Sequence, residues 1–171
     1  MANEIPLEAV APLSRNHDLS TFDCGQPPLN EYLQKYALAN QQNRSARSFV
    51  VSRGNRVVGY YTLAAGSVEA ETAPARVKKG LGKYPLPIIL LARLAVDQQE
   101  KGQGLGKALI KDALLRALRA SELVGCRAVL VHAKDASAQA FYSKFGFEPS
   151  PSNELHLFLL MKDIESLTQT T

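Results

Sequence analysis

A glycine-rich stretch between an apolar run and a helical pattern is the part of this chain best suited to bind an anion. It reads Lys101-Gly102-Gln103-Gly104-Leu105-Gly106 and follows the apolar residues 88–96. Glycines let the backbone turn sharply and let phosphate oxygens approach its N–H groups. The unpaired N–H groups and the dipole at a helix N-terminus favour negative charge at the same point. The stretch therefore predicts a phosphate-binding loop.

The spacing of its glycines distinguishes this loop from two other phosphate motifs. A P-loop ends in Gly-Lys-Ser/Thr, whereas here the last glycine precedes Lys107-Ala108. A dinucleotide fingerprint has the spacing G-x-G-x-x-G, whereas this chain has G-x-G-x-G after a lysine. Taken alone, the glycines also fit a plain strand-to-helix connection, so both interpretations stay open at this point.

Positive charge is concentrated in one segment of the chain. Residues 44–93 contain nine Lys and Arg and two Glu, a net charge of +7, whereas the whole chain carries +4. Such asymmetry indicates a polyanionic partner. It fits equally well a solvated basic loop together with the binding of a cofactor phosphate.

Composition limits the class of protein. A length of 171 residues and an apolar fraction of 46% predict one globular domain over residues 1–171. No apolar run reaches the roughly 18 residues of a membrane span, and residues 1–6 lack the basic and apolar regions of a secretory signal. The two cysteines and three histidines are too scattered for a disulfide framework or a metal site. We therefore expect a cytoplasmic protein with no metal and no membrane partner.

The predicted elements place a β-α-β unit around the glycine loop. The apolar run at 87–96 indicates a buried central strand, and a helix links it to the strand at 127–132, so the two should be parallel. The predicted order is a strand at 5–13, a helix at 27–40, strands at 48–52 and 57–63 joined at Gly54-Asn55, an exposed loop at 71–85, the strand at 87–96, a helix ending near Val124, the strand at 127–132, a helix at 137–145 capped by Gly146, and a strand at 155–161.

This order resembles the GCN5-related N-acetyltransferase (GNAT) superfamily. The acetyl-CoA signature of that family is Arg/Gln-x-x-Gly-x-Gly/Ala, and residues 101–106 match it with Lys101 in place of Arg or Gln. The segment Ala140-Phe141-Tyr142-Ser143-Lys144-Phe145-Gly146-Phe147 is also typical of the family. The resemblance covers the whole chain and implies an α/β (mixed α+β) fold. In that fold a central mixed sheet of six to seven strands has helices on both faces, and the two parallel central strands splay apart.

Residues near the N-terminus narrow the resemblance. Phe22-Asp23-Cys24-Gly25, followed by Leu29-Asn30-Glu31-Tyr32-Leu33, is similar to the opening of the TacT/AtaT-type acetyltransferase toxins, and the stretches 59–63 and 91–96 fit the same subgroup. Those toxins transfer acetyl from acetyl-CoA to the amino group of aminoacyl-tRNA and so block translation. The resemblance implies the same activity here, a ribbon-helix-helix antitoxin of the DUF1778 type as partner, and a homodimer. The basic segment would suit a tRNA-binding face.

The resemblance also implies which residues bind acetyl-CoA and which one is catalytic. The backbone of Leu94, Ala95 and Val96 should pair with the pantetheine arm, and an N–H there should polarise the thioester carbonyl. Tyr142 matches the catalytic tyrosine and should protonate the departing thiolate, although it could also be a packing aromatic. The backbone N–H groups from Gly102 onward should bind the pyrophosphate, and Ser137 could touch the cofactor or could instead be a helix cap. The remaining predicted cofactor-binding residues are therefore Lys101, Gly102, Gln103, Gly104, Leu105, Gly106, Lys107 and Ser137.

Contacts with tRNA are predicted from charge. Arg93 lies in an apolar strand, where a charge is costly unless it is paired or faces a cleft. We expect it to face the tRNA acceptor end, with a buried ion pair to a carboxylate as the alternative. Candidates for contacts with tRNA phosphates are Arg76, Lys78, Lys79 and Lys83.

Two further functions compete with this interpretation. The chain could acetylate a small amine, an antibiotic or a protein N-terminus, or it could be a catalytically inactive binding module. An α-amine acceptor is favoured, because its pKa of about 8 leaves much of it neutral, whereas a lysine with a pKa of about 10.4 needs a base. The apolar strand supplies no carboxylate before Asp97.

Overall fold

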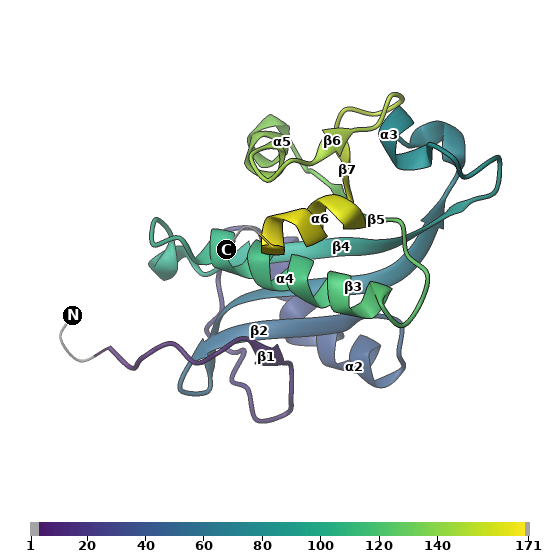
Figure 1. Cartoon of the computed structure of the whole chain (residues 1–171). Coiled ribbons are helices and arrows are strands. Elements are labelled where there is room, and N and C mark those ends of the chain that lie inside the picture. Colours follow the sequence, from purple (N-terminus) through teal and green to yellow (C-terminus); the bar gives the residue numbers. More distant parts are fainter. Residues whose placement is uncertain (1–3, 170–171) are drawn as a thin grey trace. The chain divides into compact units, whose positions relative to one another are not determined.

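The computed structural model of the chain describes residues 4–169 and has seven strands in one mixed sheet, in the order β1-β2-β3-β4-β5-β7-β6 (Figure 1). The sheet confirms the predicted fold class. The strands are β1 Ala11–Pro12, β2 Arg47–Arg53, β3 Arg56–Val68, β4 Leu86–Val96, β5 Ala128–His132, β6 Glu148–Pro149 and β7 His156–Leu160. The helices are α1 Pro27–Glu31, the π-helix η1 Tyr32–Tyr36, α2 Ala37–Gln42, the 3-10 turn η2 Ala70–Thr72, α3 Ala75–Lys78, the 3-10 turn η3 Gln98–Glu100, α4 Leu105–Ser121, α5 Ala136–Ser143 and α6 Met161–Gln169.

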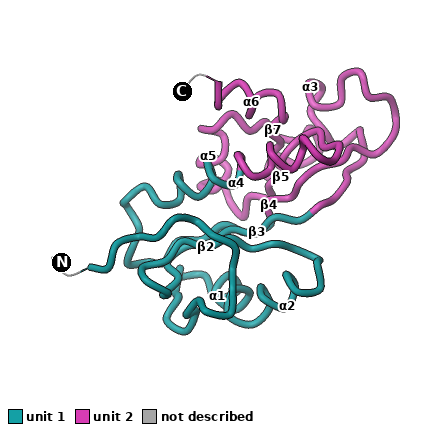
Figure 2. The backbone as a smooth tube through the Cα atoms, turned by 60° about the horizontal axis from the view of Figure 1, so that its bottom comes forward, with its two compact units in different colours: residues 1–64, 92–113 teal, residues 65–91, 114–171 magenta. Residues whose placement is uncertain are grey.

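The chain divides into two compact units, each with its own buried core (Figure 2). Unit 1 comprises residues 1–64 and 92–113, and unit 2 comprises residues 65–91 and 114–171. The chain passes between them within β3, β4 and α4. A single domain over residues 1–171 stays a prediction.

Unit 1 contains the predicted β2–β3 hairpin. The two strands are antiparallel, with a shift in register between Val51 and Ser52, and Gly54 at the turn has a φ of +58°. The predicted strand at 5–13 was too long. Only Ala11–Pro12 pairs with β2 as a strand, and Leu7 makes an isolated bridge to Arg53.

The predicted helix at 27–40 is present but not uniform. Pro27 and Pro28 occupy its first turn, where their missing N–H groups cost nothing. Its middle turn is the π-helix η1, which the apolar spacing did not indicate. Tyr32 and Leu33 from this turn are buried in the unit 1 core.

A glycine in β3 lets α4 approach the strands of unit 1. A Cβ on Gly59 would lie 2.9 Å from Cγ1 of Val51 and 3.1 Å from Cδ1 of Leu109. Both distances are shorter than ordinary packing permits, so a larger residue would push the helix away. Because the glycine loop leads directly into α4, this contact helps to fix the position of the loop.

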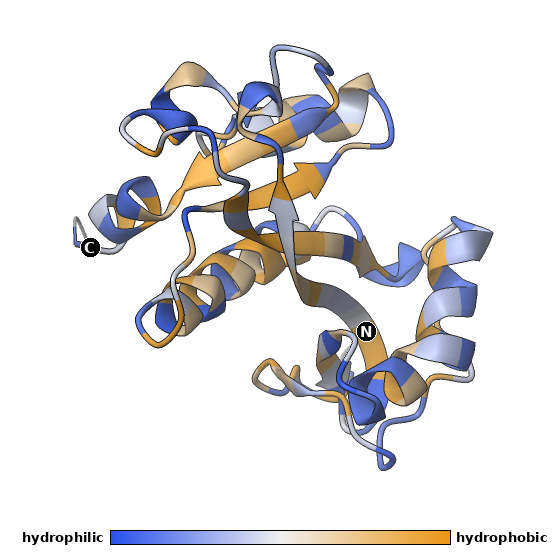
Figure 3. Ribbon diagram, turned by 90° about the vertical axis from the view of Figure 1, so that its right-hand side faces the viewer, coloured by the Kyte–Doolittle hydropathy of each residue, from blue (hydrophilic) through white to orange (hydrophobic). Residues whose placement is uncertain are grey.

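Unit 2 contains the predicted parallel pair of strands. Ile88 to Leu91 of β4 lie opposite Ala128 to Val131 of β5, and β5 continues the sheet with an antiparallel partner, β7. The short strand β6 and the helix α6 were not predicted. Figure 3 shows apolar residues concentrated on the strands, while the connecting loops are mostly hydrophilic.

The segment predicted as an exposed loop at 71–85 is partly buried. Ala73 and Val77 have no exposed surface and lie in the core of unit 2. The short helix α3 places Val77 inward while its charged neighbours face outward. Among the helices described for residues 4–169, none is both long and apolar enough to cross a membrane.

Candidate active site

The predicted phosphate loop is an exposed turn that leads from η3 into α4. Gly102 and Gly104 have φ angles of +83° and +80°, in the left-handed region where other residues are strained. A Cβ on either glycine would meet no atom within 4 Å. The space over both glycines is therefore open, and a phosphate group could approach the backbone there.

The N-terminus of α4 adds unpaired amides to this loop. Ala108 donates its N–H to the Gly104 carbonyl at 3.1 Å, so the hydrogen-bond ladder of the helix begins there. The N–H groups of Leu105, Gly106 and Lys107 come before that bond and have no partner inside the helix. α4 is 17 residues long, so its N-terminal dipole favours an anion beside these amides.

The strand end that precedes the loop contains the residues predicted to bind pantetheine. The parallel pairing of β4 with β5 covers Ile88–Leu91, whereas β4 itself continues to Val96. Ala95 belongs to the buried core of unit 1, and Leu94 and Val96 are half-buried. Their side chains are therefore packing residues, and the prediction concerns only their backbone.

The side chain of Lys101 has a partner within the protein. Its ammonium group donates to the carbonyl of Cys24 at 2.9 Å. The sequence motif predicts that this cation meets the cofactor. In the structure the side chain joins the glycine loop to the segment 22–26, and contact with the cofactor stays a prediction.

Arg93 stacks on an aromatic ring rather than pairing with a carboxylate. Its guanidinium lies 3.6 Å from the centroid of the Tyr32 ring, a close cation–π contact. Tyr32 is held in turn by Asn40, which donates to its hydroxyl at 3.2 Å. Within residues 4–169 no carboxylate forms an ion pair with Arg93, so the alternative prediction of such a pair is wrong for the described chain.

The predicted catalytic tyrosine lies on α5 in unit 2. The Tyr142 ring packs edge-on against Phe141 and Phe147, with centroids 5.2 and 5.6 Å apart. Burial raises the pKa of Tyr142 to about 12. The phenol therefore keeps its proton at neutral pH, as a proton donor must.

Ser137 does not cap this helix. The N-cap of α5 is Asp135, whose carboxylate accepts the N–H of Ala138 at 2.8 Å. Ser137 is exposed in the first turn. The capping alternative for Ser137 is therefore wrong, because an aspartate two positions earlier already fills that role.

The predicted tRNA-binding cations differ in their ion pairs within the protein and in their solvent exposure. Arg76 donates to Glu148 at 2.7 Å and to Asp163 at 3.1 Å, so its charge is already balanced within unit 2. Lys79 and Lys83 are exposed and Lys78 is half-buried. The three lysines are therefore better candidates for phosphate contacts than the arginine.

Sequence reasoning missed a buried ion pair beside the glycine loop. Arg53 donates from Nε and from Nη2 to the two oxygens of Glu100, each at 2.9 Å. The Arg53 hydrogen bond lowers the pKa of Glu100, which is only 3% exposed. Glu100 immediately precedes Lys101, so the pair fixes the entry to the loop. No sequence signal connects two residues 47 positions apart.

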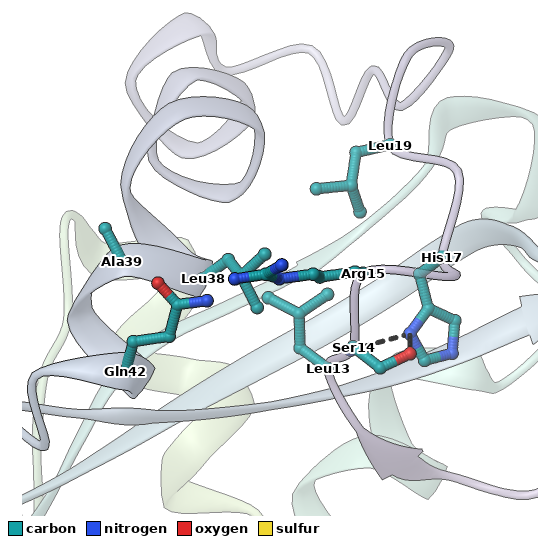
Figure 4. A pocket seen from close by; sticks show the side chains of 8 residues that line it. All are labelled: Leu13, Ser14, Arg15, His17, Leu19, Leu38, Ala39 and Gln42. Atoms are coloured by element: carbon teal, nitrogen blue, oxygen red, sulfur yellow. Dashed lines mark hydrogen bonds between the residues drawn. The ribbon is translucent and has the colours of Figure 1, made fainter.

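Unit 1 also has a cavity away from the predicted residues. Its volume is about 460 Å³, and Figure 4 shows the side chains of Arg15 and Gln42 facing each other over Leu13 and Leu38. None of the predicted cofactor-binding residues lines it. In the part of the chain that the structure describes, no three His, Cys, Asp or Glu side chains are placed to hold a metal ion.

Comparison with known proteins bears out the family that the loop indicates. Residues 44–149, more than half of the chain, match the acetyltransferase (GNAT) domain family. The chain is 49% identical over 155 residues to the tRNA-acetylating toxin of Mycobacterium tuberculosis. The alignment covers 91% of this chain and 93% of that protein.

Two solved structures resemble the whole fold. One is AtaT complexed with acetyl-methionyl-tRNAfMet, with a TM-score of 0.88, 32% identity and coverage of 95% of this chain and 99% of that one. The other is a tyrosine-to-phenylalanine variant of AtaT bound to acetyl-CoA and to the C-terminus of the antitoxin AtaR. Its TM-score is 0.80, with 31% identity and coverage of 95% and 98%. The chain therefore belongs to the GNAT family of acetyltransferases.

Proposed function

We propose that this protein is an acetyl-CoA-dependent toxin that acetylates the α-amino group of aminoacyl-tRNA and thereby inhibits translation. The observation that carries the proposal is the 49% identity to a tRNA-acetylating toxin along 91% of the chain. The open glycine loop at the start of α4 supports it, because its backbone is shaped for a phosphate-bearing cosubstrate.

Acetyl-CoA supplies the activated acetyl thioester, and unit 1 supplies backbone groups to hold it. The N–H groups from Gly102 to Lys107 bind the pyrophosphate. The backbone of Leu94, Ala95 and Val96 pairs with the pantetheine arm, and an N–H of this strand end polarises the thioester carbonyl.

Tyr142 acts as the proton donor. When the amine nitrogen forms its bond to the acetyl carbon, the carbon–sulfur bond breaks and CoA departs as a thiolate. The Tyr142 hydroxyl transfers its proton to that sulfur as negative charge develops there. The nitrogen of the new amide loses its extra proton to solvent, and the tyrosinate takes up a proton from solvent before the next turnover. With a pKa of about 12, the phenol is protonated before each turnover.

The acceptor amine needs little help from the protein to lose its own proton. An α-amino group has a pKa of about 8, so a substantial fraction is neutral at physiological pH. Asp97, the first carboxylate after the apolar strand, is buried and accepts backbone N–H groups from Asp23 and Gln99 at 3.0 and 2.9 Å. It is therefore engaged in holding the backbone, which supports an α-amine acceptor over a lysine.

The contacts with tRNA come from a strand arginine and from surface lysines. Arg93, whose guanidinium lies over the Tyr32 ring, contacts the acceptor end, and Lys78, Lys79 and Lys83 contact phosphates. Replacing Lys78 and Lys79 together with alanine should weaken tRNA binding and make its dependence on salt shallower. An unchanged salt slope would remove both lysines from the interface.

Regulation follows from the same resemblance. We propose that the toxin acts in the cytoplasm as a homodimer and is neutralised by a ribbon-helix-helix antitoxin of the DUF1778 type. The support is that the AtaT structure described above carries the C-terminus of its antitoxin.

A cell-free translation reaction tests the function. The purified protein should stop synthesis of a reporter only when acetyl-CoA is added, and CoA alone should have no effect. Inhibition without acetyl-CoA would indicate a binding module. No inhibition, with acetyl transfer to polyamines or peptides instead, would indicate a small-amine or N-terminal acetyltransferase.

A further inference from the structure

The segment Phe22-Asp23-Cys24-Gly25 has no role in the mechanism, yet its hydrogen bonds converge on the entry to the glycine loop. All of these contacts lie within unit 1. We propose that residues 22–26 brace the glycine loop, and that Asp23 and Lys101 are positioning residues that hold it in the shape that binds acetyl-CoA. The proposal rests on acetyl-CoA being the cosubstrate.

The two segments are joined at backbone level. Asp23 donates its N–H to the Asp97 carboxylate at 3.0 Å, and its carbonyl accepts the N–H of Gln98 at 2.9 Å. Asp97 accepts the N–H of Gln99 as well, at 2.9 Å, and so caps η3. One buried carboxylate thus connects segment 22–26 to the turn that precedes Lys101.

The side chain of Asp23 organises its own segment. Its Oδ1 accepts the N–H of Gly25 at 2.9 Å and the amide of Asn30 at 3.0 Å. Asn30 returns a bond, because its Oδ1 accepts the N–H of Cys24 at 2.9 Å. These bonds fix the direction of the Cys24 carbonyl, which is the group that accepts the ammonium of Lys101 at 2.9 Å.

The remaining residues of the segment anchor it. Phe22 is 2% exposed and packs edge-on against Tyr60, with ring centroids 5.6 Å apart. Gly25 has a φ of +88°, and a Cβ there would lie 3.0 Å from the side-chain nitrogen of Gln98. A larger residue at position 25 would therefore have a strained backbone, and the Gln98 side chain would have to move aside.

The glycine loop needs such a brace because little else holds it. Gly102 and Gly104 have no neighbour within 4 Å of a Cβ position, and glycine populates many backbone conformations. The entry is fixed by Glu100, through Arg53, and by Lys101, through Cys24. Ordering the loop in advance removes an entropic cost from cosubstrate binding. Lys101 therefore acts through the loop backbone rather than as a phosphate ligand.

A double-mutant cycle separates these two roles. Acetyl-CoA affinity is measured by titration calorimetry for the wild type, Lys101→Met, Asp23→Ala and the double variant. Each single substitution should weaken binding about tenfold, the scale of one hydrogen bond to a charged group. The double variant should be weakened little further, because both substitutions release the same contact. Lys101→Arg should retain most of the affinity, since a guanidinium can also donate to the Cys24 carbonyl.

Matched controls keep the test decisive. Lys107→Met removes a charge from the same loop without touching residues 22–26, so its effect should add fully to that of Asp23→Ala. Fully additive effects of Lys101→Met and Asp23→Ala would overturn the proposal and make Lys101 a direct ligand. If Asp23→Ala does not fold, Asn30→Ala replaces it in the cycle, because it removes the acceptor of the Cys24 N–H and one donor to Asp23. Failure of the wild type to bind acetyl-CoA would instead refute the proposed function.

Discussion

Replacing Gly104 with alanine tests the glycine cradle most specifically. Gly104 has a φ of +80°, and a Cβ there would meet no atom within 4 Å. A methyl group at this position therefore causes no clash, and the only intrinsic penalty is backbone strain. The substitution isolates the left-handed backbone from every side-chain contact.

The size of the effect follows from that strain. A non-glycine residue in a sparsely populated backbone region costs about 1–3 kcal/mol. If the loop keeps its shape, the free energy of unfolding falls by this amount. If the loop relaxes, the same cost appears in cosubstrate binding, which weakens by roughly 5- to 150-fold.

Titration calorimetry with acetyl-CoA and urea unfolding measure the two parts. Gly125→Ala is the matched control, because Gly125 is exposed, has open space around its Cβ position and has no positive φ. The control should bind acetyl-CoA like the wild type. If Gly104→Ala retains both wild-type stability and wild-type affinity, the left-handed backbone at this position has no role in cosubstrate binding.

Three other substitutions test the surroundings of the site. Glu100→Gln should lose less stability than the wild type when the pH is lowered. Arg53 lowers the pKa of Glu100, so the ion pair stabilises the fold fully above the usual pKa of 4.5 and progressively less as the pH falls below it. A difference in urea midpoint between wild type and variant that stays the same at every pH would contradict this. Tyr32→Leu removes the ring under Arg93, a contact worth about 0.5–2 kcal/mol. Steady-state kinetics should then show a higher KM for charged tRNA and an unchanged KM for acetyl-CoA. The opposite pattern would be inconsistent with contact between Arg93 and the tRNA acceptor end. Gly59→Ala should lower the free energy of unfolding by about 1–3 kcal/mol, because the added methyl group overpacks against Val51 and Leu109. An unchanged melting temperature would argue against the close approach of α4 to β3.

Local sequence signals predicted the elements that carry the site. Gly54-Asn55 indicated the β2–β3 hairpin, and the apolar runs on either side of α4 indicated the parallel pair β4 and β5. These signals succeed because a turn residue or an apolar period acts within a few positions of the chain. The glycine loop itself was predictable for the same reason.

Contacts between distant residues could not be predicted in the same way. Arg76 was expected to be free for tRNA, but its partners Glu148 and Asp163 lie 72 and 87 positions away. Arg93 lies over Tyr32, the first residue of a π-helical turn that helical spacing did not indicate. Val77 is buried although its neighbours are basic, because α3 packs on unit 2 through one side only. Charge and composition identified these residues but not their partners.

Mass spectrometry of the reaction product shows directly whether the protein acetylates aminoacyl-tRNA. The protein is incubated with labelled acetyl-CoA and total charged tRNA, the tRNA is digested with nuclease, and the Tyr142→Phe variant is treated in parallel. We expect labelled N-acetyl-aminoacyl-adenosine from the wild type and far less from the variant, with acetyl-CoA binding retained in both. Absence of any acetylated aminoacyl-adenosine from the wild type, or equal yield from Tyr142→Phe, would contradict the acceptor or the proton donor respectively.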